Sequence, residues 1–219
     1  MPAETADVRP ADDEGARACS KRDDERTALD VSLNAYRENT QSHTTTFSDF
    51  TPRVMHRIAG HVSRRGVALD VGCGGGRDVA WLRSQGCAAI GVDAVGEMIS
   101  GLGGAVVADA RALPFGDGVF QAVYSIAGLV HLDERGVRSA VSEMVRVSGE
   151  GGVFYVSLRA GEDSSRWEDS PWGVRWYREW QPETIRHLCE DAGVKVSEVT
   201  IEEDATRREI AWVSVYGAV

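Results

Sequence analysis

A glycine-rich loop with an acidic residue at its entrance is the first feature of the sequence that could bind a ligand. In "LDVGCGGGRDVAWL", residues 69–82, glycine occupies four of the five positions from Gly72 to Gly76, and Asp70 stands two residues before them. Glycine allows the backbone to adopt positive φ and to approach a bound molecule closely. The loop therefore predicts a ligand held against the main chain.

The spacing of these glycines excludes two common nucleotide-binding loops. A dinucleotide fingerprint requires G-x-G-x-x-G, but the third glycine counted from Gly72 would fall at Arg77. A P-loop requires G-K-S or G-K-T after its glycines, and neither tripeptide occurs. The pattern that is present is Asp70-x-Gly72-x-Gly74-x-Gly76.

Two further segments carry side chains that could contact a ligand. The stretch 32–47 places a tyrosine and a histidine among polar residues, and the stretch 166–180 holds four tryptophans and a tyrosine. Aromatic rings suit a flat or apolar molecule, or a cation. Packing is the alternative for both: a solvated helix on the sheet for the first, and an inserted helix or hairpin for the second. The candidate ligand contacts are Tyr36, His43, Trp172 and Trp176.

Strands and helices alternate along most of the chain, which predicts an open α/β sheet, mostly parallel and covered by helices on both faces. The last two strands are separated by only six residues and should pair antiparallel. In such a sheet the first strand-to-helix loop lies at the crevice where ligands bind, which favours a nucleotide-like ligand. The predicted strands are 67–71, 88–93, 105–109, 119–126, 151–158, 194–202 and 209–217, and the predicted helices are 76–85, 95–102, 181–193 and one that Asp133 caps.

Length and composition predict one globular domain. The chain has 219 residues, of which 42% are hydrophobic, and a formal net charge of -10. Residues 1–26 mix charges without apolar periodicity and are expected to be a disordered tail, leaving 27–219 as the single domain. No apolar run approaches the ~20 residues of a membrane span, and none resembles a signal peptide, so we expect a cytoplasmic protein without membrane contact.

Metal chemistry and nucleic-acid binding are not expected. The four cysteines are scattered without a C-x-x-C pair, and no metal-ligand constellation is apparent. An acidic net charge weighs against a nucleic-acid partner, although a local basic patch could exist within it.

Four stretches resemble, in the same order, the motifs of the class I S-adenosylmethionine-dependent methyltransferases. The match covers roughly residues 30–217. The resemblance implies a Rossmann-like, doubly wound sheet of seven strands with an antiparallel C-terminal strand. It also implies S-adenosylmethionine as cofactor and S-adenosylhomocysteine as product. The stretches are "LDVGCGGGRD", "GVDAVGEMI", "VVADARALPFGDGVFQAVYSIAGLVHL" and "EMVRVSGEGGVFYVSL".

The resemblance assigns cofactor contacts to particular residues. Asp70 would face the methionyl amine, Asp93 would accept from both ribose hydroxyls, and Asp109 with the N–H of Ala110 would bind adenine. Each acid has a structural alternative, since Asp70 could cap a helix and acids are common at strand ends. Met98 could line the adenine pocket or belong to the helix core. The other expected cofactor contacts are Gly72, Cys73, Gly74, Ala94 and Ser125.

Methyl transfer is an in-line displacement that needs alignment and exclusion of water rather than a protein nucleophile. In related enzymes the segment before the first strand forms a helical lid, which we expect here from residue 27 onward. His131 follows the fourth strand, where the family places many groups that face the acceptor. It could take a proton from the acceptor, or it could cap a helix or bind a backbone carbonyl.

The acceptor is expected to be a small molecule, in bacterial specialised metabolism, and the enzyme a monomer or homodimer. The sequence lacks the [ND]PPY stretch and the Pro-Cys dipeptide of nucleic-acid base methyltransferases, and no extra capture domain is present. A tRNA or protein methyltransferase whose partner recognises the substrate is the alternative. The missing dinucleotide fingerprint opposes a nicotinamide-dependent reductase. The intact acids oppose a non-catalytic S-adenosylmethionine-binding protein.

Overall fold

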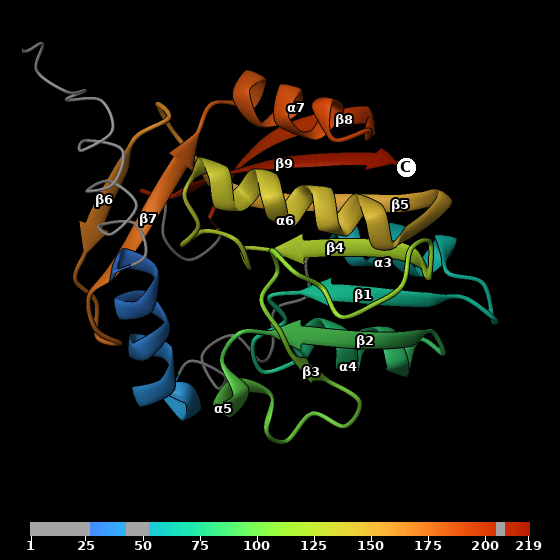
Figure 1. The fold of residues 1–219 in the computed structure, drawn as a ribbon, viewed down its shortest axis with the longest axis horizontal. Coiled ribbons are helices and arrows are strands. Elements are labelled where there is room, and N and C mark those ends of the chain that lie inside the picture. The colour runs from blue at the N-terminus through green and yellow to red at the C-terminus, as the bar shows by residue number, and fades with distance from the viewer. Residues whose placement is uncertain (1–26, 43–52, 205–208) are drawn as a thin grey trace, which may run out of the picture.

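Five parallel strands form the centre of the sheet. The computed structural model describes residues 27–42, 53–204 and 209–219, so the expected tail 1–26 and His43 lie outside the described residues. The strand order is β3-β2-β1-β4-β5, with all four pairs parallel (Figure 1). Their bounds are β1 (Val67–Val71), β2 (Ala88–Asp93), β3 (Val106–Val107), β4 (Phe120–Ile126) and β5 (Ser148–Ala160).

Two C-terminal strands extend this sheet beyond β5. β9 (Ala211–Ala218) pairs antiparallel with β5, and β8 (Lys195–Glu203) pairs antiparallel with β9. The predicted antiparallel pairing of the closing strands is therefore confirmed. Of these two strands, β9 runs against the direction of the parallel strands, whereas β8 runs with them because two antiparallel steps return it to the direction of β5.

The predicted count of seven strands was too low, because the aromatic segment after β5 folds into a hairpin. β6 (Ser165–Glu168) pairs antiparallel with β7 (Arg175–Trp180). β7 also pairs in parallel with the last residues of β5, at Arg159 and Ala160. β5 continues two residues past its predicted end, and these two residues pair with β7. Conversely, the third strand is shorter than predicted and comprises only Val106 and Val107.

Helices cover both faces of the sheet because alternate strand residues bury apolar side chains on opposite sides. Leu69 and Val123 pack with the helices of one face, whereas Ala68 and Ala122 pack with those of the other. The carboxylate of Asp133 accepts from the N–H of Gly136 and caps α6, as predicted. The helices of the first face are α6 (Glu134–Val147) and α7 (Pro182–Asp191); those of the second are α3 (Val54–His61) and α4 (Arg77–Ser84).

The N-terminal helix, residues 27–38, and the β6–β7 hairpin lie together at the edge where the parallel strands end (Figure 1). The main-chain N–H of Trp176 donates to Ser32 Oγ at 2.9 Å, and Asn39 donates to the carbonyl of Trp172 at 3.2 Å. Two segments far apart in sequence thus form one wall beside the strand ends. Among the described residues, no helix is long and apolar enough to cross a membrane.

The first glycine of the loop gives a test of local strain. Gly72 has φ +76, and a Cβ there would lie 2.6 Å from Gly128 Cα. Gly86 has φ +81 with open space around it, and so serves as a matched control. We expect Gly86→Ala to lower the free energy of unfolding by about 1 kcal/mol, through backbone strain alone. Gly72→Ala should lower it by about 2–4 kcal/mol, because the backbone must also move.

Urea denaturation of both variants measures these losses. Equal losses in the two variants would mean that the loop relaxes freely around the new methyl group.

Candidate active site

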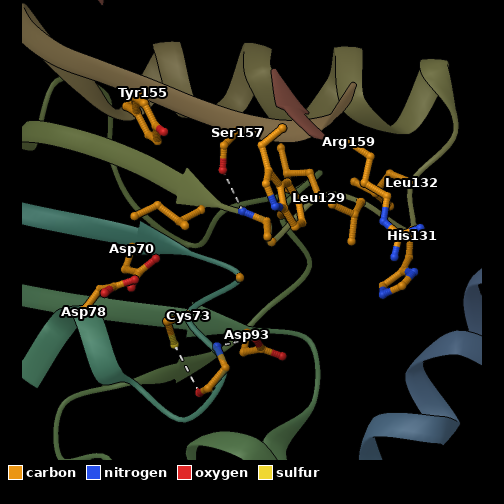
Figure 2. Close-up of a pocket in the computed structure, with 18 of the residues that line it drawn as sticks. Asp70, Cys73, Asp78, Asp93, Leu129, His131, Leu132, Tyr155, Ser157 and Arg159 are labelled. Carbon is orange, nitrogen blue, oxygen red and sulfur yellow. Dashed lines mark hydrogen bonds between the residues drawn. The ribbon is translucent and has the colours of Figure 1, made fainter. Parts of the chain in front are cut away.

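A cavity of about 1700 Å³ opens at the carboxyl ends of β1, β2, β4 and β5. Pockets for one small ligand usually measure roughly 300–1,000 Å³, so this cavity has room for two molecules. Acidic residues of β1, α4 (Arg77–Ser84) and β2 line one end, and His131 with Arg159 lies at the other (Figure 2). No group of three or more possible metal ligands occurs in the described part of the chain.

Asp93, at the end of β2, holds the glycine loop in place. Its two carboxylate oxygens accept from the N–H of Gly74 at 2.8 Å and from the N–H of Val95 at 2.9 Å. Burial raises the pKa of Asp93, while these donors act in the opposite direction. The N–H groups of Gly72 and Cys73 both donate to the carbonyl of Val92. The loop is therefore fixed to β2 in a shape that leaves Asp93 lining the cavity.

Asp70 is a buried carboxylate that also lines the cavity. Burial, followed by the negative charge of nearby Asp78, raises the pKa of Asp70 well above its usual range, and Arg77 only partly offsets this. Arg77 is instead paired with Asp78 at 2.6 Å. The N-cap of α4 is Gly76 and no side chain caps this helix, so the helix-cap alternative for Asp70 does not hold. A ligand ammonium group would supply the charge partner that Asp70 lacks.

The remaining residues predicted to contact the cofactor occupy different environments. Ala94, Ala110 and Met98 line the cavity, and Met98 is also buried as a residue of the helix core would be. Burial raises the pKa of the Cys73 thiol well above its usual range, which keeps the thiol protonated. Ser125 is a correction: it is fully buried, donates to the carbonyl of Val71 at 2.7 Å, and is not among the described residues that line the cavity.

Asp109 lines the cavity but already has a charged partner. Arg111 donates to both of its carboxylate oxygens through its side chain, with the closest contact 2.6 Å, and its N–H donates at 2.8 Å. The Arg111 hydrogen bonds, which outweigh burial, lower the pKa of Asp109. This acid is therefore ionised and held in place, but its oxygens are shared.

A hydrogen-bonded chain connects His131, Tyr36 and Arg175 at the other end of the cavity. His131 Nδ1 lies 2.5 Å from the carbonyl of Trp176, and since a carbonyl only accepts, Nδ1 carries the proton. The Nε2 lone pair then accepts from the Tyr36 hydroxyl at 2.9 Å. Arg175 donates to the same hydroxyl oxygen at 3.0 Å. His131 therefore binds a backbone carbonyl, as one alternative predicted, and its role in proton transfer stays a prediction.

The side chains of the aromatic segment 166–180 differ in whether they line the cavity. Trp172, Arg175 and Tyr177 line the cavity, whereas Trp176 does not and contributes only main-chain groups to the wall. The sequence reasoning missed Arg159 and Arg175, which also line the cavity. The alternation in "RWYREW" could have indicated Arg175 and Tyr177 on one face of a strand. No signal in the sequence singled out Arg159.

Residues 69–156 match the family described as "Methyltransferase domain". A curated relative from Encephalitozoon cuniculi, whose name assigns it to the methyltransferases, is 28% identical over 191 residues, covering 78% of this chain and 90% of the relative. This match supports the assignment of the chain to the class I S-adenosylmethionine-dependent methyltransferases.

Solved methyltransferase structures share this fold. The 1,6-didemethyltoxoflavin N1-methyltransferase of Burkholderia thailandensis, crystallised with 1,6-didemethyltoxoflavin and S-adenosylhomocysteine, has a TM-score of 0.66 at 17% identity, covering 97% of this chain and 92% of that one. A Haloferax volcanii methyltransferase in complex with the Trm112 activator has a TM-score of 0.62 at 17% identity, covering 85% and 96%. The cofactor of this chain is S-adenosylmethionine.

The buried charge of Asp70 predicts opposite effects on stability and on cofactor binding. Because its pKa is raised in the folded state, the folded protein holds this proton more tightly, and stability falls as pH rises from the usual carboxyl pKa through the raised one. Asp70→Asn removes the free-energy cost of ionising this buried carboxyl group. At pH 8 without ligand, we expect this variant to be more stable by about 1–2 kcal/mol, or roughly 3–6 °C in Tm.

Thermal unfolding from pH 4 to pH 8, together with calorimetry of S-adenosylhomocysteine, measures both effects. The stabilisation should shrink as pH falls, and product affinity should drop. Asp191→Asn, in an exposed side chain of α7, is the control. A Tm gain that is independent of pH would contradict the assigned charge.

Proposed function

We propose that the enzyme methylates a small molecule bound between the cofactor and the wall formed by the N-terminal helix and the β6–β7 hairpin. The observation that carries this proposal is that wall. It brings Tyr36, Trp172 and Arg175 into the same cavity as Asp93, so that a second compartment adjoins the cofactor end. The N-terminal helix, residues 27–38, would act as a lid, because several of its side chains line the cavity while the helix lies outside the sheet.

The chemistry of the acidic end suits each part of the cofactor. In this proposal, Asp70 receives the methionyl ammonium, which provides the cation that its buried carboxylate lacks. Asp93 accepts from the ribose hydroxyls with the lone pairs that its backbone donors leave free. Asp109 and the N–H of Ala110 receive adenine. Gly72 and Gly74 keep the loop free of side chains where the methionyl end would pass.

At the other end, the chain of hydrogen bonds can remove a proton from the acceptor. When bound, S-adenosylmethionine supplies an electrophilic methyl group on a sulfonium. As the acceptor oxygen or nitrogen forms its bond to this methyl carbon, the carbon–sulfur bond breaks and its electrons return to sulfur. The acceptor's proton would pass to the Tyr36 oxygen, while the Tyr36 proton moves to His131 Nε2. Tyr36 would then be the group that touches the acceptor, with His131 behind it.

The Burkholderia enzyme supports a small-molecule acceptor, since its structure contains one. The charges that line the cavity support it too. Carboxylates outnumber arginines among the described lining residues, which disfavours a polyanionic nucleic acid. A cytoplasmic setting in bacterial specialised metabolism, and a monomer or homodimer, remain predictions.

A partner-dependent tRNA or protein methyltransferase is the second candidate, and the Haloferax complex with an activator favours it. Transfer of methyl label from the cofactor into three separate pools tests both: small metabolites, total tRNA and total protein. We expect label in the metabolite pool. Label found only in a macromolecular pool, or only after an activator is added, would replace the first proposal by the second.

The ribose contact predicts a large effect of one carboxylate. Asp93→Ala should weaken S-adenosylhomocysteine binding by about 2–4 kcal/mol, because charged hydrogen bonds in a buried site are lost. Calorimetry measures the change, and circular dichroism checks folding. Asp191→Ala, which removes an exposed carboxylate far from the cavity lining, should bind like the parent. An unchanged Kd in folded Asp93→Ala would remove this residue from the site.

The proton path predicts a specific pattern in the kinetics. With the acceptor found by label transfer, His131→Asn and Tyr36→Phe should each lower kcat by about 10²-fold, the usual effect of losing a general base. Both should bind S-adenosylhomocysteine nearly as the parent does. His131→Asn retains hydrogen bonding but cannot act as a base, so it separates proton transfer from positioning. His187→Asn, on the exposed face of α7, is the matched control.

Near-parental turnover by His131→Asn would restrict this histidine to holding the hairpin and Tyr36 in place. An acceptor that needs no deprotonation would give that result while leaving the methyltransferase activity unchanged.

A further inference from the structure

Two buried arginines line the acceptor end of the cavity. Arg159, on β5, is 3% exposed and Arg175, on β7, is 4% exposed. Arginine remains protonated in proteins, so both positions hold a permanent positive charge away from bulk water. A buried charge is costly unless it is paired. Their partners therefore indicate what the cavity is built to receive.

Arg175 has only neutral partners in the part of the chain that the structure describes. Its Nη1 donates to the Tyr36 hydroxyl at 3.0 Å and its Nη2 to Ser170 Oγ at 3.1 Å. No described carboxylate lies within ion-pair distance of it, and its buried Nε–H has no acceptor. The side chains that the structure describes therefore leave the charge of Arg175 uncompensated.

Arg159 is only partly compensated. Its Nη1 donates to Glu168 at 2.5 Å, and its guanidinium lies 3.4 Å from the centroid of the Tyr177 ring. Glu168 also accepts from Arg166, so one carboxylate serves two cations. The Nε–H of Arg159 is buried without an acceptor, like that of Arg175. Both guanidinium groups therefore retain a donor and unneutralised charge beside the same cavity.

We infer that the methyl acceptor carries an anionic group, a carboxylate or a phosphate, that binds Arg159 and Arg175. This inference rests on the proposed function, and it specifies the class of substrate. Guanidinium groups bind such oxyanions with strong, charge-assisted hydrogen bonds. The anion would supply both the missing acceptors and the missing negative charge.

The surrounding rings indicate that the acceptor is planar. The guanidinium carbon of Arg175 lies 5.2 Å from the Tyr36 ring centroid and 5.5 Å from those of Trp172 and Tyr177. Such rings provide flat apolar walls. A cationic acceptor, which aromatic residues alone would permit, is disfavoured because two guanidinium groups already place positive charge beside these rings. An anion bound by Arg175 would lie beside Tyr36, to which Arg175 donates, and so would align the acceptor with the proton path.

Matched aromatic probes test the inference before the natural acceptor is known. Benzoate and phenyl phosphate carry the two anionic groups, and benzamide is a neutral analogue of benzoate. Each is titrated by ligand-observed NMR against the full chain saturated with S-adenosylhomocysteine. We expect at least one anion to bind about tenfold or more tightly than benzamide, as expected for a charge-assisted contact.

Three variants locate the preference. Arg159→Gln and Arg175→Gln should each remove most of the preference for the anion. Arg178→Gln should preserve it, because Arg178 lies on β7 as well but pairs with Glu134 and is not among the described cavity-lining residues. Calorimetry with S-adenosylhomocysteine verifies that each variant is folded with an intact cofactor end.

The outcomes separate the two proposals. Benzamide binding as tightly as both anions, no binding of any probe, or an equal loss in Arg178→Gln would each overturn the anionic acceptor while leaving the proposed function in place. A chain that carries methyl label only into macromolecules would overturn the proposed function itself.

Discussion

Because the central strands of the sheet are all parallel, their carboxyl ends meet at one edge, and every feature of the site depends on this constraint. β1 ends before the glycine loop, β2 ends at Asp93, and β4 and β5 end beside His131 and Arg159. Hydrogen bonds then fix the loop to the neighbouring strand, through the carbonyl of Val92 and the carboxylate of Asp93. The sheet therefore holds the glycine-rich loop in one position.

Charge is distributed unevenly along the cavity. Asp70, Asp78 and Asp93 gather at the cofactor end, where burial raises the pKa of Asp70 and of Asp93. Arg159 and Arg175 gather at the hairpin end. A cofactor with an ammonium group complements the first end, and an anion complements the second. Both ends carry buried charge that the described side chains neutralise only in part, which costs some stability.

The β6–β7 hairpin does more than cover the site. It supplies Trp172, Arg175 and Tyr177 to the cavity, and its main chain binds His131 and Ser32 through Trp176. The hairpin is itself anchored by β7 pairing with the end of β5. Movements of this segment would therefore change the position of His131 as well as access to the cavity. In a family whose cofactor chemistry is shared, such an insertion is where acceptor specificity can arise.

The sequence alone determined the parts of this protein that depend on local pattern. Alternating strands and helices predicted the mostly parallel sheet, Asp133 predicted the start of α6, and four motifs in register indicated a methyltransferase. The tertiary structure decided what depends on contacts between distant segments. Ser125 turned inward to bind Val71, Trp176 faced away from the cavity, and Tyr36 met His131 across 95 residues of sequence. Spacing along a chain reports which residues share a helix or strand face, but only the packing of the hairpin against the N-terminal helix brings Arg175, Tyr36 and His131 together.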